Sequence, residues 1–196
     1  VFYDARGQVL PVGATVRNPL LADALRKVFA DADQQGWFIE AVFLEPVQNA
    51  GGCFPPPPGY FERVREICDE YDVLLVSDEV ICAFGRIGSM FACSDFGYVP
   101  DIITCAKALS SSFLPISAVM VNERVFRGIA EGSSAVGTWG HGFTYSGHPV
   151  AAAVGLANLR ILKEEKILEK VREETAPYLQ KRLRELADHP LVGEVR

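Results

Sequence analysis

The sequence predicts an α/β protein in which a parallel sheet lies between two layers of helices. Short apolar runs alternate with longer segments whose apolar residues recur at helical spacing. One run, residues 73–76, is apolar at every position, which is typical of a strand covered on both faces. No internal repeat or low-complexity linker interrupts this alternation. Together these observations favour a three-layer α/β/α arrangement.

The elements follow one another along the chain. The predicted strands are residues 41–44, 73–76, 102–105 and 116–121. The predicted helices are residues 20–32, 123–130, 149–163 and 167–187, and one more in which Phe61, Val64, Ile67 and Tyr71 share a face. Pro177 removes a backbone donor, so we expect the last helix to kink or divide there. The four prolines at 55–58 exclude a helix interior and a central strand, and they indicate a stiff loop.

Composition limits the class of function. The chain has 196 residues, 49% of them hydrophobic, which is enough for a packed core and favours one domain. Nineteen basic and 25 acidic residues give a net charge of −6, which argues against nucleic acid or an anionic membrane as the main partner. No apolar run approaches the roughly 20 residues of a membrane span, and the first residues do not resemble a secretory signal.

The cysteines and histidines indicate no metal site. Five cysteines contain no C-x-x-C pair, and the three histidines lack the spacing of metal ligands. Buried, reduced thiols are the simpler interpretation, and they are typical of a cytoplasmic protein. We therefore expect a cytoplasmic protein that uses no metal.

Two charged residues follow predicted strands at the edge where parallel α/β sheets bind ligands. Asp78 comes after residues 73–76, and Lys107 comes after residues 102–105. Taken alone, Asp78 is explained as a cap and Lys107 as a side chain that reaches water. An acid after an apolar strand is nevertheless costly to bury unless a cation meets it.

Together the two residues fit pyridoxal phosphate chemistry. A lysine amine forms a Schiff base with this cofactor and later moves the α-proton of the substrate. A carboxylate facing the pyridine nitrogen keeps the ring protonated, so that it acts as an electron sink. Val80 is two residues beyond Asp78, so an extended backbone would place it on the same side, against the face of the ring.

Four segments, in this order, resemble the class III aminotransferases, a family of fold-type I pyridoxal phosphate enzymes. They read LEPVQNAGG at residues 44–52, DEVICAFGRIG at 78–88, PDI followed by AKALSS within 100–111, and HGFTYSGHP at 141–149. The resemblance covers nearly the whole chain from about Trp37 onward. It implies the α/β/α large domain of fold type I.

The resemblance also implies roles for single residues. Lys107 is the catalytic lysine, Asp78 is the partner of the pyridine nitrogen, and Val80 packs on the ring. Thr144, with the backbone of Phe143, reaches the cofactor phosphate of the neighbouring subunit, which implies a homodimer with a shared active site. The structural alternative for this last segment is a glycine-rich turn before a helix that begins near the following proline.

The implied reaction is transfer of an amino group to pyruvate or another 2-oxo acid by a ping-pong Schiff-base mechanism. Ala50 stands where members acting on ornithine or using glutamate carry a glutamate, and Ile81 where they often carry glutamine. The chain is therefore most similar to the branch that uses ω-amino acids or simple amines with pyruvate. Asn49, Ala108 and Ser112 replace glycines of many members, and the first and last of these are expected to crowd a turn.

Members of the family are more than twice as long as this chain, which also lacks an initiator methionine. We therefore expect residues 1–188 to be part of the large domain and residues 189–196 to begin a small C-terminal domain. The rest of the phosphate site and the carboxylate-binding arginine are expected outside this chain, and the isolated chain is expected to be inactive. Two alternatives stay open: another reaction on the same scaffold, such as an aminomutase or a decarboxylase, or an incomplete remnant that acts only in structure or dimerisation.

Overall fold

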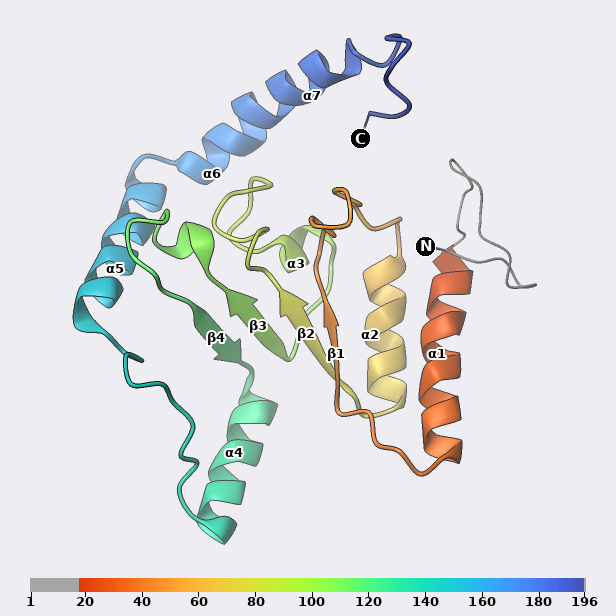
Figure 1. Ribbon diagram of the computed structural model, residues 1–196, viewed down its shortest axis with the longest axis vertical. Coiled ribbons are helices and arrows are strands. Elements are labelled where there is room, and N and C mark those ends of the chain that lie inside the picture. The colour runs from red at the N-terminus through yellow and green to blue at the C-terminus, as the bar shows by residue number, and fades with distance from the viewer. Residues whose placement is uncertain (1–17, 196) are drawn as a thin grey trace.

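A four-stranded sheet lies at the centre of the computed structural model, which describes residues 18–195 (Figure 1). Its strands are β1 (Ala41–Leu44), β2 (Leu74–Asp78), β3 (Ile102–Cys105) and β4 (Ala118–Val121), in that order across the sheet. The first three are parallel and β4 is antiparallel to β3. The sequence predicts all four strands but not this reversal. Parallel neighbours need a crossover, and only the short 3₁₀ helix η1 (Lys107–Leu109) lies between β3 and β4.

β2 is buried on both sides, as its continuous apolar pattern predicts. Leu75 and Val76 point to opposite faces, and their exposed fractions are 0% and 1%. Leu75 packs with the buried face of α2 (Tyr60–Glu70), which includes Phe61 and Val64. The helical spacing predicts this face correctly.

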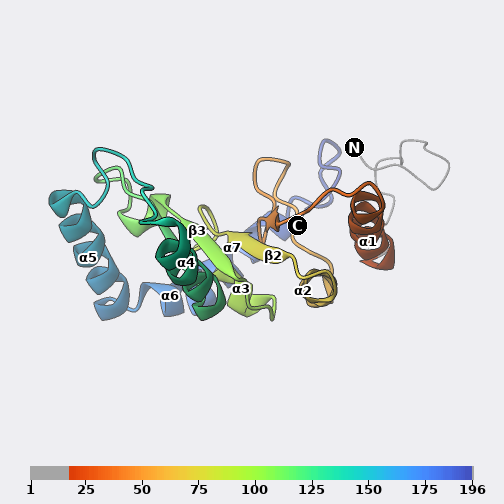
Figure 2. The same cartoon turned by 90° about the horizontal axis from the view of Figure 1, so that it is seen from below.

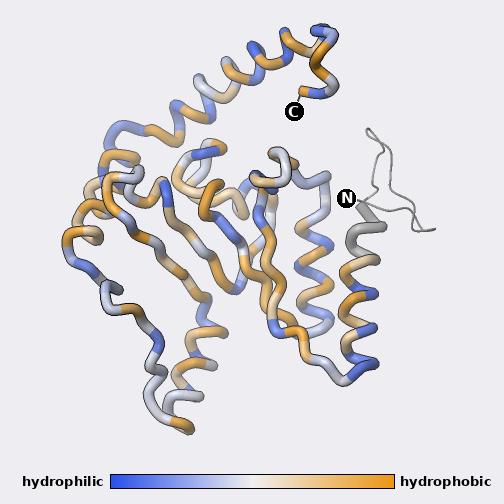
Figure 3. The backbone as a smooth tube through the Cα atoms, in the orientation of Figure 1, coloured by the Kyte–Doolittle hydropathy of each residue, from blue (hydrophilic) through white to orange (hydrophobic). Residues whose placement is uncertain are grey.

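α1 (Asn18–Gln34) lies beside α2 in Figures 1 and 2, and Phe29 packs there with Ile67 and Val73. Figure 3 shows apolar residues running along the strands and alternating with polar residues along α2. On the sheet face opposite α2, Phe43 of β1 and Val119 of β4 are each 66% exposed. Asp78 and Thr104 lie on this same face, because side chains alternate along a strand and the two residues are register partners.

The helices after the sheet follow the predicted order. α4 (Glu123–Val136) is longer than the predicted helix at 123–130, and the Asn122 side chain caps it by accepting the Val125 N–H at 3.0 Å. α5 (Pro149–Glu164) places Leu162 in a cluster with Phe84 and Cys105. The sequence pattern does not predict α3 (Ala92–Asp95), which has only four residues.

The last predicted helix changes to a π-helical turn just before Pro177 instead of running as one regular α-helix. It consists of α6 (Ile167–Lys170), a π-helical turn η2 (Val171–Thr175) and α7 (Ala176–Arg184), whose first turn holds the proline. These pieces extend beyond the sheet at the upper edge of Figure 1. None of the helices within residues 18–195 has the length and apolar character needed to cross a membrane.

Candidate active site

Asp78 and Lys107 come at the same edge of the sheet. Asp78 is the last residue of β2, and its register partner on β3 is Thr104. Lys107 follows the end of β3 by two residues and begins η1. Because β2 and β3 are adjacent and parallel, their carboxyl ends share the edge at which α/β sheets bind ligands. The sequence predicts this placement.

The Asp78 carboxylate has one oxygen held and one open. Its Oδ1 atom accepts the Val80 N–H at 3.0 Å and the Thr104 hydroxyl at 3.4 Å. Oδ2 accepts no hydrogen bond from any residue in the described part of the chain. Asp78 also lines a cavity of about 200 Å³ with Phe43, Leu44, Glu45 and Gln48. A donor on a ligand therefore has an acceptor available beside this cavity.

Lys107 has an unusual backbone and an unpaired amine. Its φ is +41°, in the left-handed region that non-glycine residues rarely adopt and that is often held under strain at functional sites. The side chain is exposed, and within residues 18–195 its ammonium makes no hydrogen bond or ion pair. A lysine held in this way at a strand end has its amine available for reaction.

The deeply buried acid is Glu79 rather than Asp78. Glu79 is 0% exposed, and its two carboxylate oxygens accept the backbone N–H groups of Ala92 at 3.0 Å and Cys93 at 2.7 Å. Burial raises the pKa of Glu79 above its usual 4.5, and the two N–H donors oppose that rise. The expectation that an acid buried here needs a cation was wrong for Glu79, because the free N–H groups at the start of α3 take that place.

Val80 is half-buried at the first position of a turn, since β2 ends at Asp78. β2 therefore does not fix the side of the sheet on which Val80 lies. Its N–H instead closes a short loop onto Asp78 Oδ1. A contact between Val80 and a cofactor stays a prediction.

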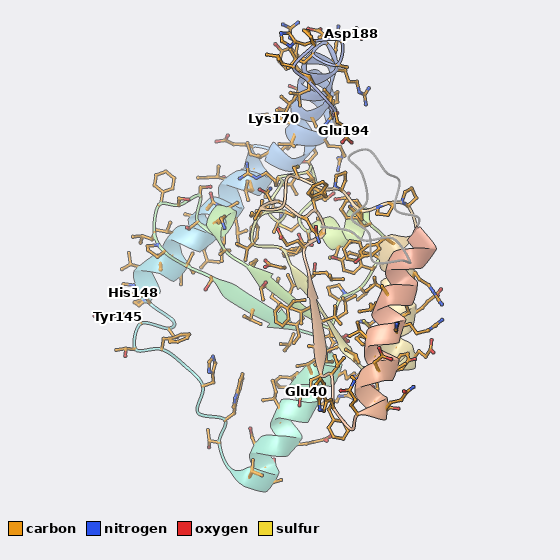
Figure 4. All side chains as sticks on the ribbon, turned by 45° about the vertical axis from the view of Figure 1, so that its right-hand side comes forward. Glu40, Tyr145, His148, Lys170, Asp188 and Glu194 are labelled. Atoms are coloured by element: carbon orange, nitrogen blue, oxygen red, sulfur yellow. The ribbon has the colours of Figure 1, made fainter. Side chains whose placement is uncertain are left out.

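Phe143 and Thr144 are not brought to Asp78. Both are exposed in the segment between α4 and α5, where the Phe143 N–H donates to Ser146 Oγ at 3.0 Å. Phe143 lines a separate cavity of about 660 Å³ whose other walls include Ile116 and His148. Figure 4 shows Tyr145 and His148 on the outer edge of the molecule at the start of α5. The helix begins at Pro149, as the turn interpretation predicts.

The contact from Thr104 to Asp78 was not predicted from the sequence. The available signal is one hydroxyl residue in the otherwise apolar run at 102–105, three positions before Lys107. Its significance depends on the register between β2 and β3, which the sequence does not reveal. Gln48 and Glu45 also lie beside Asp78 in the small cavity, and no role is assigned to either residue from the sequence.

Comparisons with known proteins identify the family of this chain. The family model described as aminotransferase class-III matches residues 13–196. A probable aminotransferase of Mycobacterium tuberculosis is 60% identical over 158 residues, which are 81% of this chain and 33% of that protein. A putrescine–pyruvate aminotransferase of Pseudomonas aeruginosa is 50% identical over 175 residues, which are 89% of this chain and 37% of that protein. The chain thus spans about a third of the length of these relatives.

Solved structures give the same result. An omega transaminase of Pseudomonas jessenii in complex with PMP superimposes with a TM-score of 0.85 at 44% identity, covering 96% of this chain and 41% of that one. A transaminase solved with L-alanine gives a TM-score of 0.86 at 50% identity, covering 91% of this chain and 42% of that one. The predicted α/β fold and the resemblance stated from the sequence are both confirmed. The chain belongs to the class III aminotransferases.

Proposed function

We propose that this chain carries the reaction centre of a pyridoxal-phosphate-dependent aminotransferase, with Lys107 as catalytic lysine and Asp78 as partner of the pyridine nitrogen. The observation that carries the proposal is the position of these two residues at the ends of the adjacent parallel strands β2 and β3. Membership of the family and similarity to a transaminase solved with PMP support this choice of cofactor.

The chemistry of the donor set fits the cofactor. A pyridine nitrogen that carries a proton needs a carboxylate acceptor, and Asp78 Oδ2 has none of its hydrogen-bonding capacity used by residues 18–195. A cofactor aldehyde needs an amine without a fixed carboxylate partner, and Lys107 provides one. Val80 would support the ring, and Phe143 with Thr144 would hold the cofactor phosphate of the neighbouring subunit.

Asp78 and Lys107 have different roles in the proposed reaction: Asp78 acts through its charge and Lys107 transfers protons. When bound, pyridoxal phosphate supplies an electron sink for the carbanion formed at the amino-bearing carbon of the substrate. Asp78 holds a proton on the ring nitrogen by its negative charge. Lys107 Nζ accepts the proton from the amino-bearing carbon of the donor and, in the second half of the cycle, returns a proton to the former carbonyl carbon of the acceptor.

The proposed donor is an ω-amino acid or a simple amine, and the proposed acceptor is pyruvate or another 2-oxo acid. One relative acts on putrescine and pyruvate by its name, and a gamma-aminobutyrate transaminase of Solanum lycopersicum is 49% identical over 158 residues, 81% of this chain and 30% of that protein. Ala50, exposed in the loop after β1, supports this branch because it cannot neutralise a substrate-binding arginine as a glutamate would.

A homodimer completes the proposal. Phe143 is 79% exposed and lies away from Asp78, which favours a role at the cofactor of a neighbouring subunit over a role in its own. Trp139 and His141, just before it, stack with ring centroids 5.5 Å apart. This exposed aromatic segment is consistent with a surface that a second copy covers.

Borohydride trapping tests the assignment of Lys107. The protein is incubated with pyridoxal phosphate, reduced, digested and mapped for the lysine that retains the cofactor. The chain contains six lysines, at positions 27, 107, 163, 166, 170 and 181. The other five lysines therefore serve as internal controls for the selectivity of labelling at Lys107. We expect the label on Lys107 and its loss in K107A but not in K163A. A label spread over the other lysines, unchanged in K107A, would contradict the proposal.

A further inference from the structure

We propose that Thr104 is a positioning residue for Asp78: its hydroxyl fixes one carboxylate oxygen so that the other faces the pyridine nitrogen. This inference rests on the proposed function, since it concerns how Asp78 meets the cofactor. Thr104 touches no reacting atom in the scheme. It acts only through the carboxylate.

The first support is the set of contacts at Asp78. The Thr104 hydroxyl and the Val80 N–H both donate to Oδ1, at 3.4 and 3.0 Å, and neither donates to Oδ2. Two donors on one oxygen fix the rotation of the carboxylate, whereas the N–H alone would leave it freer. Oδ2 is then presented to a ligand with its full acceptor capacity.

The second support is the place of Thr104 in the sheet. Thr104 is the register partner of Asp78, and its backbone carbonyl accepts the Glu79 N–H at 2.9 Å. It therefore contacts the end of β2 through both its backbone and its side chain. It is also three residues before Lys107, so β3 pairs with Asp78 at Thr104 and leads directly to the residue that carries the amine.

The third support is that the hydroxyl has no other use. Within residues 18–195, Thr104 Oγ1 makes no hydrogen bond except the one to Asp78. Strand stability and packing need only the β-branched shape, which valine shares. The hydroxyl can therefore be removed while the shape of the strand is kept.

The experiment compares two cofactors in the full-length protein. Equilibrium dialysis measures the affinity for pyridoxal phosphate and for the analogue in which carbon replaces the ring nitrogen, with wild type, T104V, T104S and D78N. Thermal unfolding of the cofactor-free proteins serves as the control for folding. The analogue cannot pair with Asp78, so the ratio of the two affinities reports on the carboxylate alone.

We expect the wild type to prefer the natural cofactor. In T104V the ratio of the affinity for pyridoxal phosphate to the affinity for the analogue should fall about fivefold, which corresponds to one modest hydrogen bond. The affinity of T104V for the analogue should be unchanged. T104S, which keeps the hydroxyl, should stay within about twofold of wild type, and D78N should abolish the preference. If T104V lowers the affinity for both ligands equally, or for neither, Thr104 has no role at the ring nitrogen. The inference about Thr104 then fails, while the proposed function is unaffected. If the wild type shows no preference, the role of Asp78 in the proposed function fails with it.

Discussion

Replacing Asp101 with alanine should remove the main polar connection between β2, β3, α2 and α4. Asp101 is 7% exposed, just before β3. Its Oδ2 atom accepts the Leu75 N–H at 2.8 Å and Arg65 Nη1 at 2.7 Å, and its Oδ1 atom accepts Asn122 Nδ2 at 2.8 Å. Asn122 in turn caps α4, so one carboxylate holds four elements at the end of the sheet away from Lys107.

The magnitude follows from what the substitution leaves behind. The Leu75 N–H belongs to a residue with 0% exposure, and an unsatisfied buried donor costs about 1–3 kcal/mol. Breaking a buried ion pair costs about 3–5 kcal/mol, but Arg65 retains Asp69 at 2.7 Å, so the lower end of that range applies. We therefore expect D101A to lower the free energy of unfolding by about 4 kcal/mol.

Urea unfolding followed by circular dichroism measures this loss, and D69A is the matched control. Asp69 pairs with the same arginine, but its side chain is 63% exposed, so its removal should cost about 0.5 kcal/mol. A D101A variant no less stable than D69A would refute the reasoning. It would mean that the backbone donor of Leu75 and the guanidinium find other partners at little cost.

Three further predictions concern pH and backbone conformation. Burial alone would raise the pKa of Asp101, but its hydrogen bonds and ion pair lower the pKa below the usual 3.8. The free energy of unfolding of wild type should therefore exceed that of D101N by its full amount above about pH 5, and the difference should shrink as the pH falls below 3.8. Urea titrations at each pH measure this difference. G88A should lower the free energy of unfolding by about 2–3 kcal/mol, because Gly88 has a φ of +98° and an added Cβ would lie 2.9 Å from Arg172 Cβ. Gly97 also has a positive φ but no atom within 4 Å of an added Cβ, so G97A should lower the free energy of unfolding by about 1 kcal/mol. Equal losses would contradict the steric argument. S112G should raise the free energy of unfolding by up to about 1 kcal/mol because Ser112 has a φ of +65°, and a loss of stability would count against strain at that turn.

Local sequence pattern predicts the strands well because each strand is a short apolar run, whereas turns and exposed helices contain more polar residues. α3 is invisible in the sequence because four residues give no periodicity, and the direction of β4 depends on the connection rather than on the strand itself. Ser112 has a φ in the left-handed region, as expected for a residue that replaces a glycine of many family members. Asn49 does not adopt a positive φ, and its backbone N–H donates to Glu45 Oε2 at 3.2 Å.

The site is predictable only to the level of strand ends. Apolar strands followed by Asp78 and Lys107 indicate the correct edge of the sheet, because that edge follows from parallel topology alone. Which acid is buried depends on a helix that the pattern does not reveal, so the role of Glu79 was beyond sequence reasoning. The contact with Thr104 depends in the same way on a register between strands that are distant in sequence.

A structure of the full-length protein crystallised with pyridoxal phosphate tests the central claim most directly. We expect continuous density between Lys107 Nζ and the cofactor, with Asp78 Oδ2 about 2.7–2.9 Å from the ring nitrogen and Oδ1 still held by Val80 and Thr104. We also expect Thr144 of the second subunit at the phosphate. A cofactor bound elsewhere, or a ring nitrogen that meets no carboxylate, would contradict that claim.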